Sequence, residues 1–574
     1  MKKNTQTYPR VIESIEDWPI NRLSEDRTAF IRDIEESTFK HLRPKKLQDL
    51  VDLIVKTIYQ ERIRVKESPW KVDPPNDRSF WNKISKQLIT KSLDRKDSGA
   101  QAEAEGILRK IIHRYAEEIV GTFKIPTFRF AQRFLTVLFN RLLNAAFDKS
   151  IASLWRGRRQ LYERLKVVGD VETVRQLFQH GTVVVVPTHS SNLDSILVGY
   201  AMDQIMGLPS FSYGAGLNLY NFGPAAYFMN RLGAYRVDRR KKNAIYLETL
   251  KTMSTLSIQR GVNSLFFPGG TRARSGELER DLKMGLLGTA VEAQRALCQS
   301  GENRKVFIVP IVIGYHFVLE APFLIEQHLR YIGKEHYLRL RDDSLSVRSW
   351  FRFVWRFFST TSDITLSIGK PMDVLGNFVD ANGRSFDRFG NEIHIGEYFM
   401  ASDRQINEDR QRESEYTKLL AERIVERYAV ENVVLSSHLV AFAVFEMLLH
   451  QHPKLDIFGI LRLPPDDYLF PFDSVVEVVE QMQAQLYTWE RDGKIKLSPE
   501  IHQPAEQTVR HGVEKLGMFH REKPLSFTKG GGIVSSNFRV LYFYHNRLNN
   551  YGLQNAVQWK SEEIEVLKLM MNDE

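Results

Sequence analysis

Cysteine is almost absent from this sequence. One residue, Cys298, stands among 574, so no disulfide bond can form within the chain. This composition fits a reducing compartment. It also leaves no cysteine-based set of zinc ligands, and we expect neither a metal ion nor another cofactor.

A long uncharged apolar run is also missing. The longest candidate, Val433–His450, contains His438 and Glu446 and falls short of the roughly 20 residues that a spanning helix needs. The first residues contain lysines with no apolar segment behind them, so we do not expect a secretory signal. If the protein meets a membrane, we expect it to lie on the surface rather than to cross it.

Acidic residues are outnumbered by basic ones. The chain has 80 Lys and Arg against 70 Asp and Glu, which gives a formal net charge of +10 and a pI near 9.3. An excess of this size suits a partner that carries phosphate groups. Nucleic acid, anionic lipid and a small phosphorylated substrate all meet that condition.

The spacing of apolar residues predicts the architecture. Up to about residue 150 they recur every three or four positions, which indicates helices, and from about residue 165 short apolar runs indicate buried strands. The expected helices of the first part are Leu47–Tyr59, Ala104–Val120 and Thr127–Phe147. The expected strands are Thr182–Val186, Ser264–Phe267, Val306–Ile313 and Ile364–Ile368. Helical patterns, Asn243–Gln259 and Met284–Leu297 among them, separate these strands.

Alternating strands and helices favour an α/β domain with a largely parallel sheet flanked by helices. We expect four regions in the chain. They are a helical N-terminal region (1–150), an α/β catalytic domain (151–375), a polar insertion or linker (376–412) and a helical C-terminal region (413–574).

The segment Val183–Ser195, VVVVPTHSSNLDS, carries the first candidate for chemistry. His189 follows a buried strand, at the edge where open α/β sheets place their sites, and Asp194 begins the next helical pattern. His189 could act as a general base, with Asp194 orienting the imidazole. However, about one His and Asp pair at this spacing is expected by chance among 15 histidines, and a helix-capping histidine beside a solvated aspartate is an equal alternative.

Three further segments resemble sites more weakly when each is taken alone. Gly233–Arg240 and Phe266–Leu278 combine glycines with arginines, a composition that suits a phosphate but equally a solvated basic turn. Val309–Ala321 is a strand that runs into Tyr315 and Glu320, and a plain core strand explains it well.

The order and spacing of the four segments together resemble the glycerol-3-phosphate acyltransferase family, of the large bacterial type, within the phospholipid and glycerol acyltransferase superfamily. The resemblance is strong over about 165–320. The matching residues are His189 and Asp194; Gly233 and Arg239; Phe267, Pro268, Gly270, Thr271 and Arg272; and Val309, Pro310 and Ile311. One residue departs from the pattern, because the family has glutamate where this chain has Gly269. That departure leaves the identity of the acceptor open.

The resemblance implies an enzyme that moves a fatty acyl group from acyl-CoA or acyl carrier protein to the sn-1 hydroxyl of glycerol 3-phosphate, the first step of phospholipid synthesis. His189 would be the base and Asp194 its orienting partner. The residues that would bind the substrate are Arg239, Gly270, Thr271, Arg272 and Arg274, with Lys283 a weaker candidate. Backbone N–H groups near Gly269 and Gly270 are candidate oxyanion donors.

Two alternatives remain open on the sequence. The nearer is another acceptor, 1-acylglycerol 3-phosphate or dihydroxyacetone phosphate. The farther is a basic nucleic-acid-binding protein. Against the latter, the arginines cluster with glycines at strand ends rather than along one helix with interleaved aromatic residues, so we expect no nucleic acid as a partner.

A membrane surface is a further expected partner. Val347–Phe358, VRSWFRFVWRFF, has no acidic residue, and on a helix its arginines would form a stripe beside Trp and Phe. Such a helix can lie in the interface of an anionic membrane, although a core-packed helix is about as good an interpretation. We expect peripheral attachment to the cytoplasmic face of the cell (inner) membrane, with Thr127–Phe147 as the next candidate anchor.

Overall fold

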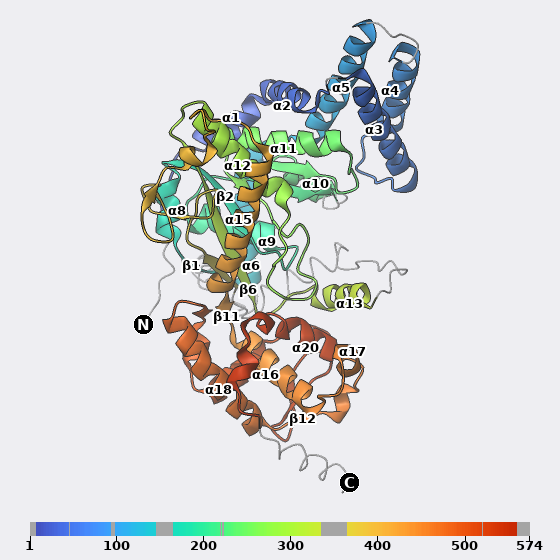
Figure 1. Cartoon of the computed structure of the whole chain (residues 1–574). Coiled ribbons are helices and arrows are strands. Elements are labelled where there is room, and N and C mark those ends of the chain that lie inside the picture. Colours follow the sequence, from blue (N-terminus) through green and yellow to red (C-terminus); the bar gives the residue numbers. More distant parts are fainter. Residues whose placement is uncertain are drawn as a thin grey trace.

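The computed structural model describes residues 7–44, 46–92, 98–144, 165–217, 220, 223–333, 364–518 and 520–559. Its parts follow one another along the molecule (Figure 1). N-terminal helices lie at one end, a seven-stranded sheet with its helices lies in the middle, and the C-terminal region lies at the other end. The limits expected above between the four regions remain predictions.

The N-terminal region is helical, as expected. Its helices are α1 (Pro19–Glu25), α2 (Arg27–Leu42), α3 (Leu47–Glu67), α4 (Asp77–Ser92), α5 (Ser98–Ile119) and α6 (Ile125–Asn144). The helix expected over Thr127–Phe147 begins two residues earlier, so Pro126 lies in its first turn rather than before it. Proline is tolerated there because the first N–H groups of a helix have no partner within it.

The central sheet has the strand order β1-β7-β6-β2-β5-β3-β4. Its strands are β1 (Leu165–Gly169), β2 (Gly181–Pro187), β3 (Ser212–Gly216), β4 (Ala234–Val237), β5 (Ser264–Leu265), β6 (Lys305–Tyr315) and β7 (Ile364–Ile368). The strands from β6 to β4 run parallel to one another, whereas β7 and β1 run the opposite way. The largely parallel sheet is therefore confirmed, with a reversed edge pair.

Both faces of the sheet are covered, which explains the uninterrupted apolar run of β2. Val183 and Val185 join a core with α8, α9 and the C-terminal helices. Val184 and Val186 join a second core with α12 and α15 on the other face. The flanking helices of the domain are α8 (Val171–Leu177), α9 (Asp194–Tyr200), α10 (Gly223–Met229), α11 (Ala244–Gln259), α12 (Met284–Gln299) and α13 (Ala321–Ile332). Side chains on alternate sides of one strand are thus buried in both directions.

The polar segment after the sheet forms a small three-stranded sheet of β8 (Phe378–Val379), β9 (Ser385–Phe386) and β10 (Glu392–Ile393). The C-terminal region then consists mainly of helices. They are α15 (Arg410–Glu431), α16 (Ser436–Gln451), α17 (Ile457–Ile460), α18 (Phe472–Arg491), α19 (Ala505–Lys515) and α20 (Phe538–His545). Short strands accompany them: β11 (Val433–Val434), β12 (Leu469–Phe470), β13 (Lys496–Leu497), β14 (Ser526–Phe527) and β15 (Ile533–Val534).

The longest apolar stretch of the sequence forms α16, which is the buried central helix of the C-terminal region. It packs between α18, α19 and α20. Within the described part of the chain, no helix combines the length and the apolar character needed to span a bilayer.

Candidate active site

The four candidate segments meet because of the sheet topology. Strands β2, β4, β5 and β6 are parallel, so their C-terminal ends reach the same edge of the sheet. His189 follows β2, Arg239 follows β4, the loop with Arg272 follows β5, and Glu320 follows β6. Residues more than a hundred positions apart thereby enter one site at the edge expected for an open α/β sheet.

His189 and Asp194 form a hydrogen-bonded pair. The Nδ1 atom of His189 lies 2.8 Å from Oδ2 of Asp194. The imidazole also stacks on Phe267, with ring centroids 4.2 Å apart. Its Nε2 atom has no hydrogen-bond partner among the described residues, and 18% of the side chain is exposed. The ring is therefore held in place while one nitrogen stays open to a substrate, as a general base requires.

Asp194 is fully buried and accepts hydrogen bonds at both carboxylate oxygens. Oδ2 receives the backbone N–H groups of Ser190 and Ser191 at 2.6 and 2.8 Å. Oδ1 receives the hydroxyl of Tyr315 at 2.5 Å. Burial, together with the charge of Asp194, raises the pKa of Tyr315 well above its usual value, so the phenol remains a donor. Asp194 also opens α9, where the helix dipole favours a negative charge.

The loop after β5 is fastened to the histidine turn. Ala273 donates its N–H to the carbonyl of His189 at 2.7 Å, and Lys283 closes the loop by donating to the carbonyl of Pro268 at 2.7 Å. Gly270 has a φ of +74°, which glycine adopts without strain, and its N–H donates to Phe267 at 3.0 Å. That N–H is therefore engaged in a turn in this structure, and an oxyanion donor near Gly269 and Gly270 stays a prediction.

Three of the expected phosphate ligands lie close enough for their charges to interact. The positive charges of Arg272 and Arg274, together with partial burial, lower the pKa of Arg239, with burial as the larger cause. Among the described residues, Arg239 makes no ion pair or side-chain hydrogen bond. Like charges gathered without a compensating acid at Arg239 repel one another, and a phosphate dianion would relieve that repulsion.

The remaining expected ligands lie at the rim of this loop. Thr271 is exposed, and Lys283 is exposed just before α12. The side chain of Lys283 passes close to Gly270, since a Cβ atom at that position would lie 3.2 Å from the Lys283 Cγ. Neither residue contacts His189 or Asp194.

Within the described part of the chain, no group of three or more His, Cys, Asp or Glu side chains could hold a metal ion.

Glu320 belongs to the site although no separate role was expected for it. Its carboxylate accepts the Ser191 hydroxyl at 3.1 Å and the Asn192 N–H at 3.0 Å. It also lies 3.5 Å from the guanidinium of Arg272. Burial raises the pKa of Glu320, with the Arg272 charge opposing this effect. Glu320 therefore links the histidine turn to the arginine loop, a role that its place in an apolar strand segment concealed.

The C-terminal region supports the site from behind. Arg547 donates to the carbonyl of Ile313 at 2.9 Å, and Tyr428 donates to the carbonyl of Val186 at 2.9 Å, so both brace the ends of the site's strands. Gly276, whose φ is +87°, packs against the backbone of Phe543, where a Cβ atom would lie 1.9 Å from the carbonyl oxygen. The close approach of α20 to the arginine loop therefore requires glycine at position 276.

Comparison with known proteins agrees with this geometry. Residues 167–314 match the model of the Acyltransferase family. The chain contains an acyltransferase domain. Over 246 residues it is 31% identical to the glycerol-3-phosphate acyltransferase of Aeromonas hydrophila subsp. hydrophila, which confirms the expected resemblance for this domain. The match covers 42% of this chain and 27% of the relative, so the chain spans only about a quarter of the curated relative it matches.

Among solved structures, the chain matches the 1-acyl-sn-glycerophosphate (LPA) acyltransferase of Thermotoga maritima. The two chains share 15% sequence identity, and the match covers 52% of this chain and 96% of the other, with a TM-score of 0.24.

Proposed function

We propose that the protein transfers a fatty acyl group from an acyl thioester to the sn-1 hydroxyl of glycerol 3-phosphate, giving lysophosphatidate. The observation that carries this proposal is the His189–Asp194 pair beside an arginine cluster at one edge of the sheet. Nε2 of His189 would accept the proton of the hydroxyl as its oxygen attacks the thioester carbonyl. The bond between the carbonyl carbon and sulfur would then break, and His189 would return the proton to the leaving thiolate of coenzyme A or acyl carrier protein. This route requires no metal ion.

The arginine cluster would bind the phosphate of the acceptor. Arg239, Arg272 and Arg274 can offer several N–H groups to its oxygens, and such charge-assisted bonds are stronger than neutral ones. Binding a phosphate there would fix the distance between the acceptor hydroxyl and His189. Correct placement of two reacting groups is itself a large part of catalysis.

A radiolabelled acyl-transfer assay with the purified protein tests this function. Glycerol 3-phosphate, dihydroxyacetone phosphate and 1-acylglycerol 3-phosphate are each offered with acyl-CoA and with acyl-loaded carrier protein. We expect the highest kcat/KM for glycerol 3-phosphate. A clear preference for one of the other acceptors would support acyl transfer but contradict glycerol 3-phosphate as the acceptor. Absence of transfer to all three would contradict the whole proposal.

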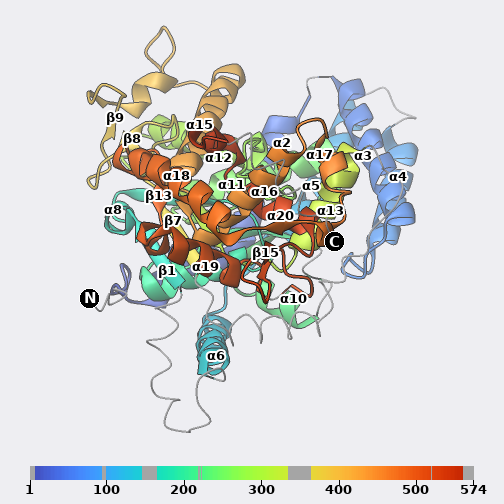
Figure 2. The same cartoon turned by 90° about the horizontal axis from the view of Figure 1, so that it is seen from below.

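We also propose that the protein attaches to the cytoplasmic face of the cell (inner) membrane as a peripheral protein. The segment Val347–Phe358, our first candidate anchor, lies outside the described residues. The second candidate, Thr127–Phe147, overlaps α6, which projects from the body of the molecule (Figure 2). Phe130 and Phe134 on this helix are 57% and 44% exposed, and their rings stack on each other.

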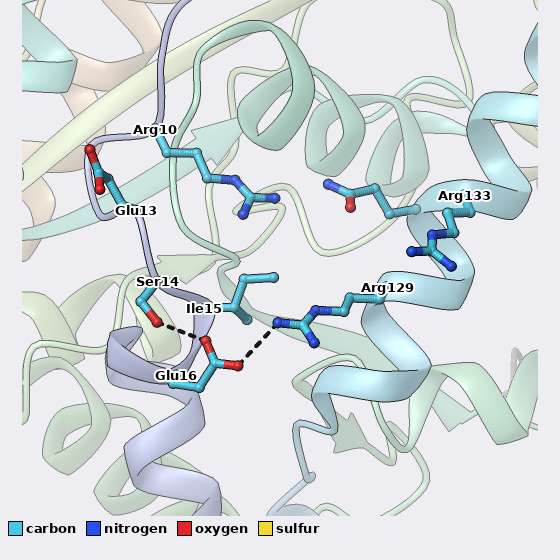
Figure 3. A pocket seen from close by; sticks show the side chains of 8 residues that line it. Arg10, Glu13, Ser14, Ile15, Glu16, Arg129 and Arg133 are labelled. Carbon is cyan, nitrogen blue, oxygen red and sulfur yellow. Dashed lines mark hydrogen bonds and ion pairs between the residues drawn. The ribbon is translucent and has the colours of Figure 1, made fainter.

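Basic groups accompany these aromatic rings. Arg129 and Arg133 on α6, with Arg10 from the N-terminal segment, line a pocket of about 360 Å³ (Figure 3). Glu16 in the same pocket already accepts hydrogen bonds from Ser14 and Arg129. Exposed aromatic rings beside arginines suit the headgroup boundary of an anionic bilayer.

Flotation with anionic liposomes tests the attachment. A variant with Phe130→Ser, Phe134→Ser, Arg129→Glu and Arg133→Glu should float less than wild type, and salt should weaken wild-type flotation. The matched control carries Phe389→Ser, another highly exposed phenylalanine, outside the N-terminal region. Equal flotation of wild type and the α6 variant, both folded, would rule α6 out as the anchor.

A further inference from the structure

The carboxyl group of Glu279 occupies the space in which a side chain at position 269 would begin. A Cβ atom built on Gly269 would lie 2.7 Å from Cδ of Glu279, and 2.9 and 3.1 Å from its two oxygens. These are its three nearest atoms. The backbone at Gly269 does not have a positive φ, so space and not backbone strain accounts for the glycine. The residue that would clash with a larger side chain here is thus itself acidic.

The same carboxyl group touches the backbone of the general base. Oε1 of Glu279 accepts the N–H of His189 at 2.9 Å. Oε2 is buried and has no hydrogen-bond partner among the described residues. A buried oxygen without a partner is unfavourable, and such an exception in a folded protein calls for a specific explanation. Glu279 therefore has one oxygen committed to the His189 turn and one oxygen still to be satisfied.

We propose that Glu279 supplies the carboxyl group that the acceptor loop lacks at position 269, and that its Oε2 binds the sn-2 hydroxyl of glycerol 3-phosphate beside His189. The inference rests on the function proposed above. A polyol acceptor has a second hydroxyl that does not react, and a hydrogen bond to it orients the reacting one. Glu279 is then a substrate-binding residue, and the absence of a side chain at Gly269 leaves room for its carboxyl group.

Protonation adds a second, separable property. Burial raises the pKa of Glu279 to about 8, with the Asp194 charge acting in the same direction and the His189 N–H opposing it. At neutral pH the group is therefore mostly a neutral carboxylic acid, which can donate as well as accept a hydrogen bond. Glutamine has the same shape and also offers a donor and an acceptor, so Glu279→Gln is a conservative replacement below pH 8.

An exchange of positions tests the assignment. Glu279→Ala should raise the acceptor KM by about tenfold, the value of one hydrogen bond to a ligand, and leave the donor KM unchanged. Gly269→Glu alone should be at least as impaired, because its side chain meets the carboxyl group of Glu279. In the double variant Gly269→Glu/Glu279→Ala, the carboxyl group introduced at position 269 can occupy the space that the Glu279 carboxyl group leaves. Its acceptor KM should therefore be lower than that of either single variant.

Two further proteins complete the experiment. Glu277→Ala removes a carboxylate from the same loop and should keep wild-type constants. Glu279→Gln should keep the acceptor KM at pH 7. The acceptor KM of wild type should change between pH 7 and 9 as Glu279 ionises, and the acceptor KM of Glu279→Gln should lack that change. An acceptor KM within twofold of wild type in Glu279→Ala would overturn the proposal, as would a double variant no better than Glu279→Ala.

The outcomes separate this inference from the proposed function. Wild type that acylates no glycerol phosphate contradicts the function itself. Wild type that acylates glycerol 3-phosphate, with Glu279→Ala affecting donor and acceptor equally and lowering the melting temperature, contradicts only the role of Glu279. In that case the residue supports the turn at His189 and does not touch the acceptor.

Discussion

The two sides of the site differ in how completely their charges are paired. On the histidine side, Asp194 is buried and both of its oxygens accept hydrogen bonds from His189, Tyr315 and two backbone N–H groups. On the arginine side, Arg239 lies among like charges and has no acid partner in the described structure. A paired network fixes geometry before a substrate arrives, whereas clustered positive charges await an anion. The His189–Asp194 pair is thus held in place before a substrate binds. The repulsion between positive charges remains at the arginines, where we propose that the phosphate binds.

The largest expected effect comes from breaking the paired side at His189. His189→Ala removes the proposed base and should lower kcat by about 100- to 10,000-fold. Its side chain makes few contacts beyond Asp194 and Phe267, so circular dichroism and the melting temperature should change little. Turnover close to that of wild type in the folded variant would refute the mechanism.

Asp194→Asn tests whether the network or the charge matters. The amide keeps the shape but cannot accept at both positions, and it favours the wrong tautomer of His189, so we expect a kcat loss of about 100-fold or more. The two backbone donors and the Tyr315 hydroxyl would share poorer acceptors, which should also lower the melting temperature. Kinetics and thermal unfolding of the same preparation measure both effects.

The arginine side should respond differently, and Arg239 and Arg272 should differ from each other. Arg239→Ala and Arg272→Ala should each raise the acceptor KM by about 10- to 100-fold, because a charge-assisted hydrogen bond contributes roughly 1.5–3 kcal/mol. Arg272 also faces buried Glu320 at 3.5 Å, so its loss should lower stability, whereas loss of Arg239 relieves repulsion and should not.

Steady-state kinetics and thermal unfolding of the arginine variants measure the split. Arg272→Lys should recover part of the stability but not the full acceptor affinity, because an ammonium cannot replace a planar fork. If the arginine variants changed only the thioester KM, the cluster would serve the donor and our assignment would be wrong.

Sequence patterns predicted only one of these two sides. The β-branched run of β2 predicted a buried strand with His189 at its C-terminal end, whereas the grouping of His189 with Arg272 came from the resemblance of the four segments to an acyltransferase family. The sequence could not predict that β7 runs antiparallel to β6, because a buried strand has the same apolar run in either direction.

Residues that act across long sequence separations were harder to find. Arg547 reaches the carbonyl of Ile313 across 234 positions, and no local pattern marks that contact. Glu279 directly follows the segment Phe266–Leu278 and lies outside its glycine and arginine pattern, so its approach to Gly269 appears only in three dimensions. The roles of His189, Asp194 and the arginines themselves stay predictions until the variants are measured.

A smaller effect should follow from removing one donor at the edge of the paired network. Tyr315→Phe takes the hydroxyl from Oδ1 of Asp194 and leaves that oxygen buried without a donor, which costs about 1–3 kcal/mol of stability. His189 keeps its own bond to Oδ2, so we expect kcat to fall by about tenfold rather than by the amount seen for Asp194→Asn. Tyr235→Phe, at a buried tyrosine of β4 whose hydroxyl has no hydrogen-bond partner among the described residues, serves as a matched control. Equal kcat for Tyr315→Phe and wild type would show that Tyr315 only fills the core.

The last expected effect is on the pH dependence of stability rather than on turnover, and it belongs to Glu279. Its pKa is raised to about 8 in the folded protein, above the usual value of 4.5, so folding favours the protonated form. The unfolded state releases this proton first as pH rises, and stability should therefore fall between about pH 4.5 and pH 8 and change no further through this group above that range. Glu279→Gln cannot ionise and should lack this component, so the melting temperatures of wild type and variant should converge at low pH and diverge in the variant's favour towards pH 8. Glu277→Gln, a change of the same kind in the same loop, should follow wild type. Parallel melting curves for Glu279→Gln and wild type from pH 5 to pH 8 would show that the carboxyl group is already ionised beside His189.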